Sequence, residues 1–187
     1  RRFWDMKAVN AVTTKINDEL DQRINVPNEE LNVWNHFLTN LNLSHQVSES
    51  AKINFDVDYA YYFFDNPSNY DYQYLDADAS ILREDKQRLT KETPIGIWVG
   101  KMDYSKKVTD KITFDTGLKG TITRFENDVT VENQFNNIWV EEPEFTSEFG
   151  MDENIFAAYT SISSPLNSKT DFKAGIRYEF TSTELGT

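Results

Sequence analysis

The chain has 187 residues, of which 39% are hydrophobic and 27% charged, and a formal net charge of −12 without any cysteine. These values describe one folded domain without disulfides, and they exclude a disordered tail. The longest apolar runs, such as AYYFF at 60–64, are too short to cross a bilayer as a helix. The acidic balance argues against nucleic acid, which is bound by clustered Lys and Arg.

The chain begins RRFWDMK, without an initiator methionine or an apolar signal region. We therefore expect residues 1–187 to be a single segment of a larger precursor, with a mature chain that has lost its leader as the alternative. The first 20 residues fit two patterns. Met6, Val9 and Val12 have helical spacing, whereas Trp4, Met6 and Ala8 fit one face of a strand, and the rest of the chain favours a strand.

Alternation with a period of two residues begins after a stretch at 18–32 that we expect to be a long loop. In FLTNLNLSHQV (37–47), apolar residues alternate with His, Asn, Ser and Gln. In KINFDVDYAYYFF (52–64), all the odd positions from Ile53 to Phe63 are apolar or aromatic. Both runs predict strands, and the SESA segment at 48–51 predicts a short turn between them.

Four further strands are expected in the second half of the chain. The runs ITFDTGLKGTI (112–122) and DFKAGIRYEF (171–180) separate apolar from polar residues cleanly. The runs at 94–104 and 148–162 are less regular because both of their faces carry apolar side chains. With the first 20 residues, this gives about six or seven strands.

The connections alternate in length. Short turns are predicted at 48–51, 105–110 and 163–169, and long polar loops at 18–32, 65–92 and 127–146. In an up-and-down meander, successive turns lie at opposite ends of the sheet. All the short turns then share one end and all the long loops the other, which is typical of outer-membrane barrels.

The predicted fold class is all-β: an antiparallel up-and-down meander of about six or seven long strands that is part of a large outer-membrane β-barrel. The alternating runs last about 11 to 15 residues, which is longer than most strands of soluble proteins and long enough for a tilted transmembrane strand. A fragment in isolation is expected to form a curled sheet or a small barrel, because its edges need partners.

Each strand then has a lipid-facing side and a side that faces the lumen of the barrel. The residues predicted to face lipid are Phe55, Val57, Phe114, Leu118 and Ile176, and the residues predicted to face the lumen are Asp56, Asp58, Lys119, Arg177 and Glu179.

Catalytic chemistry is not expected, and neither is a cofactor or a metal. His36 and His45 are nine positions apart, so strand alternation sends them to opposite faces. Asp56 and Asp58 share a face and could bind a hard cation, but solvated carboxylates are ordinary in a wet lumen. The chain has no Gly-rich phosphate loop, nucleophile elbow or zinc-ligand spacing.

Tyrosines suggest two further features. Tyr59, Tyr61, Tyr104, Tyr159 and Tyr178 lie on or near strand ends, where they could mark the headgroup boundary or simply pack on the sheet. Tyr70, Tyr72 and Tyr74 lie in an expected external loop, where they could stack on a sugar or cap a nutrient pore. A solvated loop without a ligand is the alternative for these three residues.

Several stretches resemble the "outer membrane protein beta-barrel" family, which belongs with the TonB-dependent receptors. They occur in order across nearly the whole chain: WNHFLTNLNLSH (34–45), DYAYYFFDNP (58–67), TPIGIWVGKMDY (93–104), FDTGLKGTITRFENDVT (114–130), ENIFAAY (153–159) and AGIRYEFT (174–181). The resemblance implies a barrel of about 22 strands that is plugged by a separate N-terminal domain.

The resemblance also implies a function and partners. This chain, which has no plug segment of its own, would be barrel wall of a receptor that binds and takes up a nutrient across the outer membrane of a Gram-negative bacterium. Its partners would be outer-membrane lipid, the rest of the barrel and the plug, with TonB contacting the plug and not this chain; the isolated segment could also self-associate. The alternative is a soluble secreted or surface β-sandwich that binds carbohydrate or protein.

Overall fold

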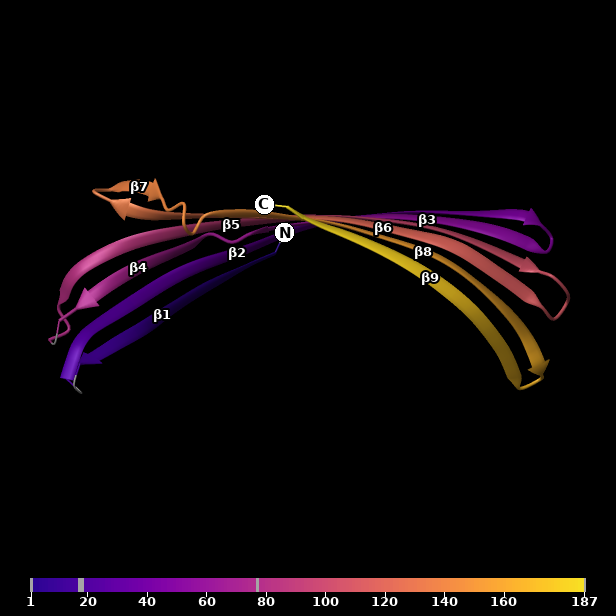
Figure 1. Cartoon of the computed structure of the whole chain (residues 1–187), viewed down its shortest axis with the longest axis horizontal. Helices are drawn as coiled ribbons and strands as arrows, with labels where there is room; N and C mark the ends of the chain where they lie inside the picture. Colours follow the sequence, from indigo (N-terminus) through magenta and orange to yellow (C-terminus); the bar gives the residue numbers. More distant parts are fainter. Residues whose placement is uncertain (1, 17–18, 77, 187) are drawn as a thin grey trace.

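A computed structural model of the chain describes residues 2–16, 19–76 and 78–186. Its strands form one antiparallel sheet that is bent into an arch (Figure 1). The strands are β1 (Arg2–Ile16), β2 (Glu19–Ser48), β3 (Ala51–Asp65), β4 (Ser68–Leu75), β5 (Ile81–Lys107), β6 (Thr113–Phe135), β7 (Ile138–Glu141), β8 (Ser147–Asn167) and β9 (Thr170–Gly186). The all-β antiparallel meander predicted from the sequence is confirmed.

The long strands follow one another across the sheet in the order β1-β2-β3-β5-β6-β8-β9. β4 lies between β2 and β5 beyond the end of β3, so β3 and β4 together occupy one strand position. β7 pairs only with the end of β6, and the hairpin between them turns at Asn136 and Asn137, whose φ angles are 50° and 64°. Positive φ at both central residues is characteristic of a type I′ hairpin turn. The sheet therefore has seven long positions and nine strands.

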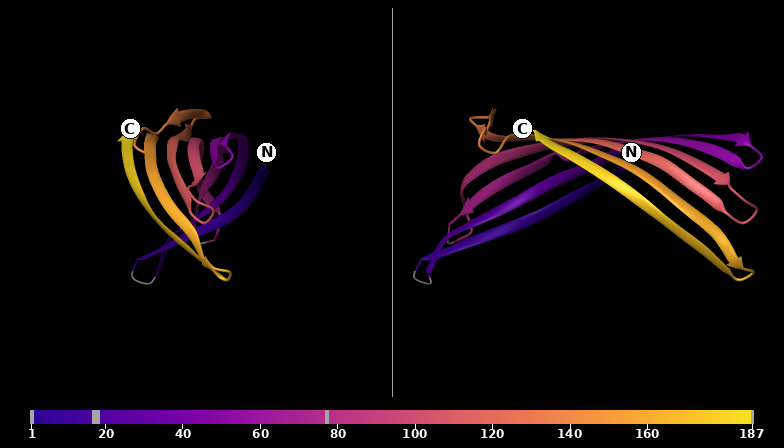
Figure 2. Two further views of the ribbon diagram at one scale, coloured as in Figure 1. Left: turned by 90° about the vertical axis from the view of Figure 1, so that its right-hand side faces the viewer. Right: turned by 45° about the vertical axis from the view of Figure 1, so that its right-hand side comes forward.

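The sheet is a single open layer. β1 and β9 form its two edges and do not pair with each other in the described part of the chain, so it is not closed into a barrel (Figure 2). All the described strands belong to this one sheet, so the β-sandwich given as the alternative is wrong for the described part of the chain. A single layer has no interior, and among the described residues the buried apolar side chains are small or medium-sized ones such as Val33, Ala51 and Val131.

The first 20 residues, for which both helix and strand were considered, form a strand as far as they are described. β1 pairs with β2 over its whole length, from Arg2 opposite Trp34 to Ile16 opposite Glu19. The prediction of a strand in this segment is therefore confirmed.

Each predicted short turn overlaps a short connection of the structure, but β5 and β8 continue through the first residues of the predicted turns at 105–110 and 163–169. β2 and β3 are joined at residues 49–50, β5 and β6 at 108–112, and β8 and β9 at 168–169. These three connections lie at the same end of the sheet because the strands alternate in direction (Figure 1).

The predicted long loops at 18–32, 65–92 and 127–146 are wrong for most of their length. β2 begins at Glu19, β4 and the first part of β5 fill most of 65–92, and β6 with β7 covers most of 127–141. These segments pair with one another as an extension of the sheet. Apart from the alternating tyrosines of β4, these segments mix polar and apolar side chains on both faces, so the pattern that identifies a half-apolar strand is missing.

Among the residues that the structure describes, no helix is long and apolar enough to cross a membrane.

Candidate functional site

One face of the sheet carries rows of charged side chains that run across the strands. The pairing register places Asp56 of β3 opposite Lys101 of β5, Lys101 opposite Lys119 of β6, and Glu179 of β9 in the same row beyond Ala157 of β8. Residues opposite one another in a ladder point to the same face. Asp56, Lys119 and Glu179, which lie far apart in the sequence, therefore share one polar surface, which we call the polar face.

The next row of the polar face contains a brace across three strands. Tyr159 of β8 lies opposite Gly117 of β6, and Gly117 lies opposite Asp103 of β5. The Tyr159 hydroxyl donates a hydrogen bond to the Asp103 carboxylate, so its ring must pass over Gly117. An added Cβ at Gly117 would lie 2.5 Å from the ring, which explains why this position has no side chain.

The charges around the brace are paired. The Lys101 ammonium lies 2.5 Å from the Asp103 carboxylate, and the Arg177 guanidinium lies 2.6 Å from the Glu179 carboxylate while its carbon stands 5.7 Å from the centre of the Tyr159 ring. Pairs between partly exposed charges stabilise a fold only weakly. This part of the polar face is thus a hydrated network of compensated charge.

The predicted polar-face carboxylates also have neutral partners. Asn40 donates a 2.7 Å hydrogen bond to Asp58, and Asn42 donates one to Asp56. Ser105 donates a 2.6 Å hydrogen bond to Asp115 lower on the same face. Within residues 2–16, 19–76 and 78–186, no cluster of three or more His, Cys, Asp or Glu side chains is arranged to hold a metal ion.

The opposite face is apolar and exposed, and we call it the apolar face. One row joins Phe55, Met102, Leu118, Ala158 and Tyr178, and the next joins Val57, Gly100, Gly120, Phe156 and Phe180. Phe114 and Ile176 belong to neighbouring rows of the same face. All the residues predicted to face lipid are thus on one side of the sheet, opposite all the residues predicted to face the lumen.

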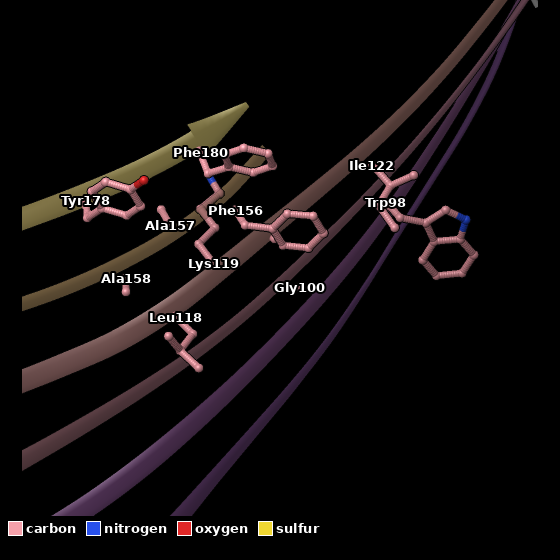
Figure 3. Close-up of a pocket in the computed structure, with 11 residues that line it drawn as sticks. Trp98, Gly100, Leu118, Lys119, Ile122, Phe156, Ala157, Ala158, Tyr178 and Phe180 are labelled. Atoms are coloured by element: carbon pink, nitrogen blue, oxygen red, sulfur yellow. The ribbon is translucent and has the colours of Figure 1, made fainter. Parts of the chain in front are cut away.

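A shallow hollow lies in the middle of the apolar face. Gly100 and Gly120 are directly opposite one another and leave backbone without side chains, while Trp98, Phe156, Tyr178 and Phe180 are spread around it (Figure 3). An added Cβ at Gly100 would meet nothing within 4 Å. The hollow has a volume of about 490 Å³ and is almost entirely apolar in its lining.

The apolar face is more exposed than the polar face, the reverse of what a soluble domain shows. In β6, for example, Phe114, Leu118 and Ile122 on the apolar face are exposed, whereas Asp115 and Lys119 on the polar face are half-buried. Side chains crowd together on the inner side of a bent sheet, so the difference indicates that the sheet curves toward its polar face. Exposed apolar surface of this size normally marks contact with a partner or a membrane.

The sheet extension beyond the apolar rows has a different character. Arg88 of β5 pairs with Glu132 of β6 through two hydrogen bonds, one of which is 2.8 Å long, and its guanidinium lies 4.6 Å from the centre of the Trp139 ring of β7. The hydrogen bond from Arg88 holds the pKa of the Glu132 carboxyl below its usual value of 4.5. These three residues are on the side of the sheet that continues the apolar face, so here even that side is polar.

Tyr70, Tyr72 and Tyr74, predicted to lie in an external loop, instead lie in strand β4. They are alternate residues and face the same side as Gln87 and Asp85 of β5, which is the side that continues the polar face. The loop prediction was wrong because an alternating Tyr-x-Tyr-x-Tyr pattern with polar residues between was read as irregular structure. The three tyrosines lie on one face of the sheet because alternate residues of a strand point to the same side.

The sequence missed the brace of Tyr159, Gly117 and Asp103. Tyr159 was grouped with tyrosines at a headgroup boundary or in sheet packing, but it lies within β8 on the polar face and donates to a carboxylate two strands away. The available signal was a glycine on the polar side of a regular strand, between Asp115 and Lys119 on the same face. Its partner could not be found without the strand register.

Comparison with known families gives a match over most of the chain. A family described as "Outer membrane protein beta-barrel family" matches residues 45–186, about three quarters of the sequence. The matched region contains strands β3 to β9, together with both faces described above. No curated protein shows a significant match to the sequence.

Proposed function

The chain belongs to the outer membrane protein beta-barrel family, and from that premise we propose that it forms part of the wall of a TonB-dependent-receptor-like protein that takes up a nutrient. Family membership implies an outer-membrane location. The Gram-negative origin, the nutrient and the coupling to TonB are our proposal.

The observation that carries the proposal is the inverted distribution of polarity. Over β3, β5, β6 and β8, apolar side chains lie on the more exposed face in register from strand to strand, and the same apolar rows continue onto β9. Burial of apolar surface in hydrocarbon would stabilise this arrangement by roughly 25 cal/mol for each Å² removed from water. We therefore assign the apolar face to lipid and the polar face to the lumen.

The open edges support a wall rather than a complete barrel. β1 and β9 each have one neighbour, and every described residue of β9 is exposed. Unpaired strand edges readily pair with other strands. We propose that the edges join further strands of the same barrel, that a plug occupies its lumen, and that TonB contacts the plug; when the segment is isolated, its edges would pair with a second copy.

The contribution of the chain is then structural and binding rather than catalytic. The polar face would line the path of the nutrient with compensated charges and hydroxyl groups. The apolar rows span the bilayer, and the extension with β4, β7 and the first part of β5 projects from it. We propose that this extension lies outside the cell, since the turns at the other end are short, as periplasmic turns are.

Uptake measurements test the proposed role in the bacterium that makes the protein. We expect deletion of the gene to lower accumulation of at least one labelled nutrient among ferric chelates, cobalamins and oligosaccharides. Removal of TonB should lower accumulation of the same compound to the same level, because both changes act on one pathway. Unchanged accumulation of all of these compounds in the deletion strain would contradict the proposal.

A further inference from the structure

We propose that the polar side of the sheet extension binds a neutral oligosaccharide, with Tyr70, Tyr72 and Tyr74 of β4 as a stacking platform. The inference rests on the proposed function, since it places this platform at the external mouth of the barrel. It goes further by naming the class of ligand and the residues that recognise it.

The three tyrosines, which we call the tyrosine file, are evenly spaced along one strand. Alternate residues of a strand repeat about every 6.6 Å, and the ring centres of Tyr70 and Tyr72 are 6.5 Å apart with 30° between their planes. The three tyrosines are half-buried and no second layer of the described chain covers them, although the Arg83 guanidinium lies 4.0 Å from the centre of the Tyr74 ring. Tyrosine rings in a row offer flat apolar surface on which the C–H face of a sugar can stack. The hydroxyl at the tip of each ring can also form hydrogen bonds with the sugar.

A chain of hydrogen-bonding groups runs beside the tyrosine file. Tyr72 donates to Gln87 at 3.2 Å, Gln87 donates to Asn133 at 3.1 Å, and Asn133 donates to Glu142 at 3.0 Å. Side-chain amides both donate and accept hydrogen bonds, as sugar hydroxyls do. A tyrosine hydroxyl is protonated at neutral pH, and burial raises the pKa of Tyr72 further above its ordinary value of 10.0, so this group can donate.

Tyr72 and Tyr74, together with Gln87 and Asn133, border a hollow of about 380 Å³, and Tyr70 lies outside it. It lies where the pairing of β5 with β6 ends, at Gln87 opposite Asn133, and Phe135 lies beyond that point. Ligand sites of this size combine an aromatic lining with a few well-placed polar groups. The hollow can therefore bind a sugar ring beside the tyrosine file.

The charges near the hollow balance one another, which favours an uncharged ligand. Arg83 lies 2.7 Å from the Asp85 carboxylate and 4.0 Å from the centre of the Tyr74 ring. Lys86 also borders the hollow, but Lys86 and Asp71, which lies opposite it in the register, belong to the other side of the sheet. A charged ligand would have to compete with the pairing of Arg83 and Asp85, whereas a neutral polyhydroxylated ligand leaves that pair in place.

Calorimetric titration of the full chain in detergent micelles tests the proposal. The probes are maltohexaose, cellohexaose, mannohexaose and xylohexaose, with anionic sialyllactose and cationic glucosamine hexamer as charged comparators. We expect at least one neutral hexasaccharide to bind and the charged compounds to bind more weakly. Tyr72→Ala should lower the association constant about tenfold or more, because it removes the central ring of the platform.

Trp139→Ala is the matched control, since it removes an aromatic ring at the same end of the sheet but on the other side. It should change the association constant by less than about twofold. The inference is overturned if no neutral hexasaccharide binds, if the charged compounds bind as well, or if Trp139→Ala weakens binding as much as Tyr72→Ala. A protein that inserts into membranes and binds none of the sugars contradicts this inference alone, whereas failure to insert contradicts the proposed barrel wall.

Discussion

Leu118→Arg is expected to stop the chain from assembling in a membrane, whereas Lys119→Glu should leave assembly intact. Leu118 lies in the middle of the apolar face, between Met102 and Ala158, and is 54% exposed. An arginine on the lipid side of a barrel near the bilayer midplane costs roughly 2–4 kcal/mol. Lys119 is the next residue but points to the polar face. The carboxylate introduced by Lys119→Glu would contact water there and would lie opposite Lys101 on the neighbouring strand.

The two variants are compared by heat-modified migration in gels and by recovery in the membrane fraction. We expect Leu118→Arg to lose the heat-sensitive folded band and Lys119→Glu to keep it. The pair is matched because the two positions are adjacent on one strand and both substitutions change the local charge. Leu118→Arg introduces a positive charge, and Lys119→Glu replaces a positive charge with a negative one. Equal behaviour of the two variants would show that the faces have been assigned wrongly.

Gly117→Ala is expected to destabilise the sheet by roughly 1–3 kcal/mol, as overpacking and the loss of a hydrogen bond to a carboxylate usually do. The new Cβ would lie 2.5 Å from the ring of Tyr159 and would displace it. The ring would then lose its hydrogen bond to Asp103. Urea unfolding of the refolded chain, followed by tryptophan fluorescence, measures the change.

Gly100→Ala is the control for this prediction, because its added Cβ meets nothing within 4 Å. Both substitutions change the backbone preference of a strand glycine in the same way, so the difference between them isolates the contact with Tyr159. In a Tyr159→Ala background, Gly117→Ala should no longer be costly. The brace is refuted if Gly117→Ala matches Gly100→Ala, or if its cost is the same with and without the tyrosine ring.

The sequence was informative where one side of a strand is apolar. The runs around Phe55, Leu118 and Ile176 alternate cleanly, so their strands and their division into two faces could be predicted. Apart from the alternating tyrosines of β4, the extension could not be recognised, because its segments mix polar and apolar residues on both sides. There the strands continue through backbone pairing, for example from Tyr70 opposite Gln87, without a one-sided pattern to reveal them.

Contacts between strands needed the register, which no local pattern contains. Asp103, Gly117 and Tyr159 are separated by up to 56 residues, and their meeting depends on the turn lengths at 108–112 and on the long connection from β6 to β8. A shift of one residue in either pairing would send Tyr159 to the other face. The tyrosine file shows the same limit, since its neighbours on β5 and β6 come from distant parts of the chain.

The two faces support a single physical account of the chain. Crowded, compensated polar groups occupy the inner side of the bend, and large apolar side chains occupy the outer side without cover from this chain. In water, much of the apolar face would be exposed to solvent. In a bilayer, the same face would contact the hydrocarbon chains of lipids, which is favourable. The central claim is therefore that the apolar face meets lipid.

Cysteine labelling in membranes tests that claim most directly, because the natural chain contains no cysteine. Leu118→Cys and Lys119→Cys are each introduced into the protein in cells, and a charged, water-soluble maleimide is added to isolated membranes. The account predicts rapid labelling of Lys119→Cys and little labelling of Leu118→Cys until detergent or denaturant is added. Rapid labelling of Leu118→Cys in intact membranes, with Lys119→Cys protected, would contradict it.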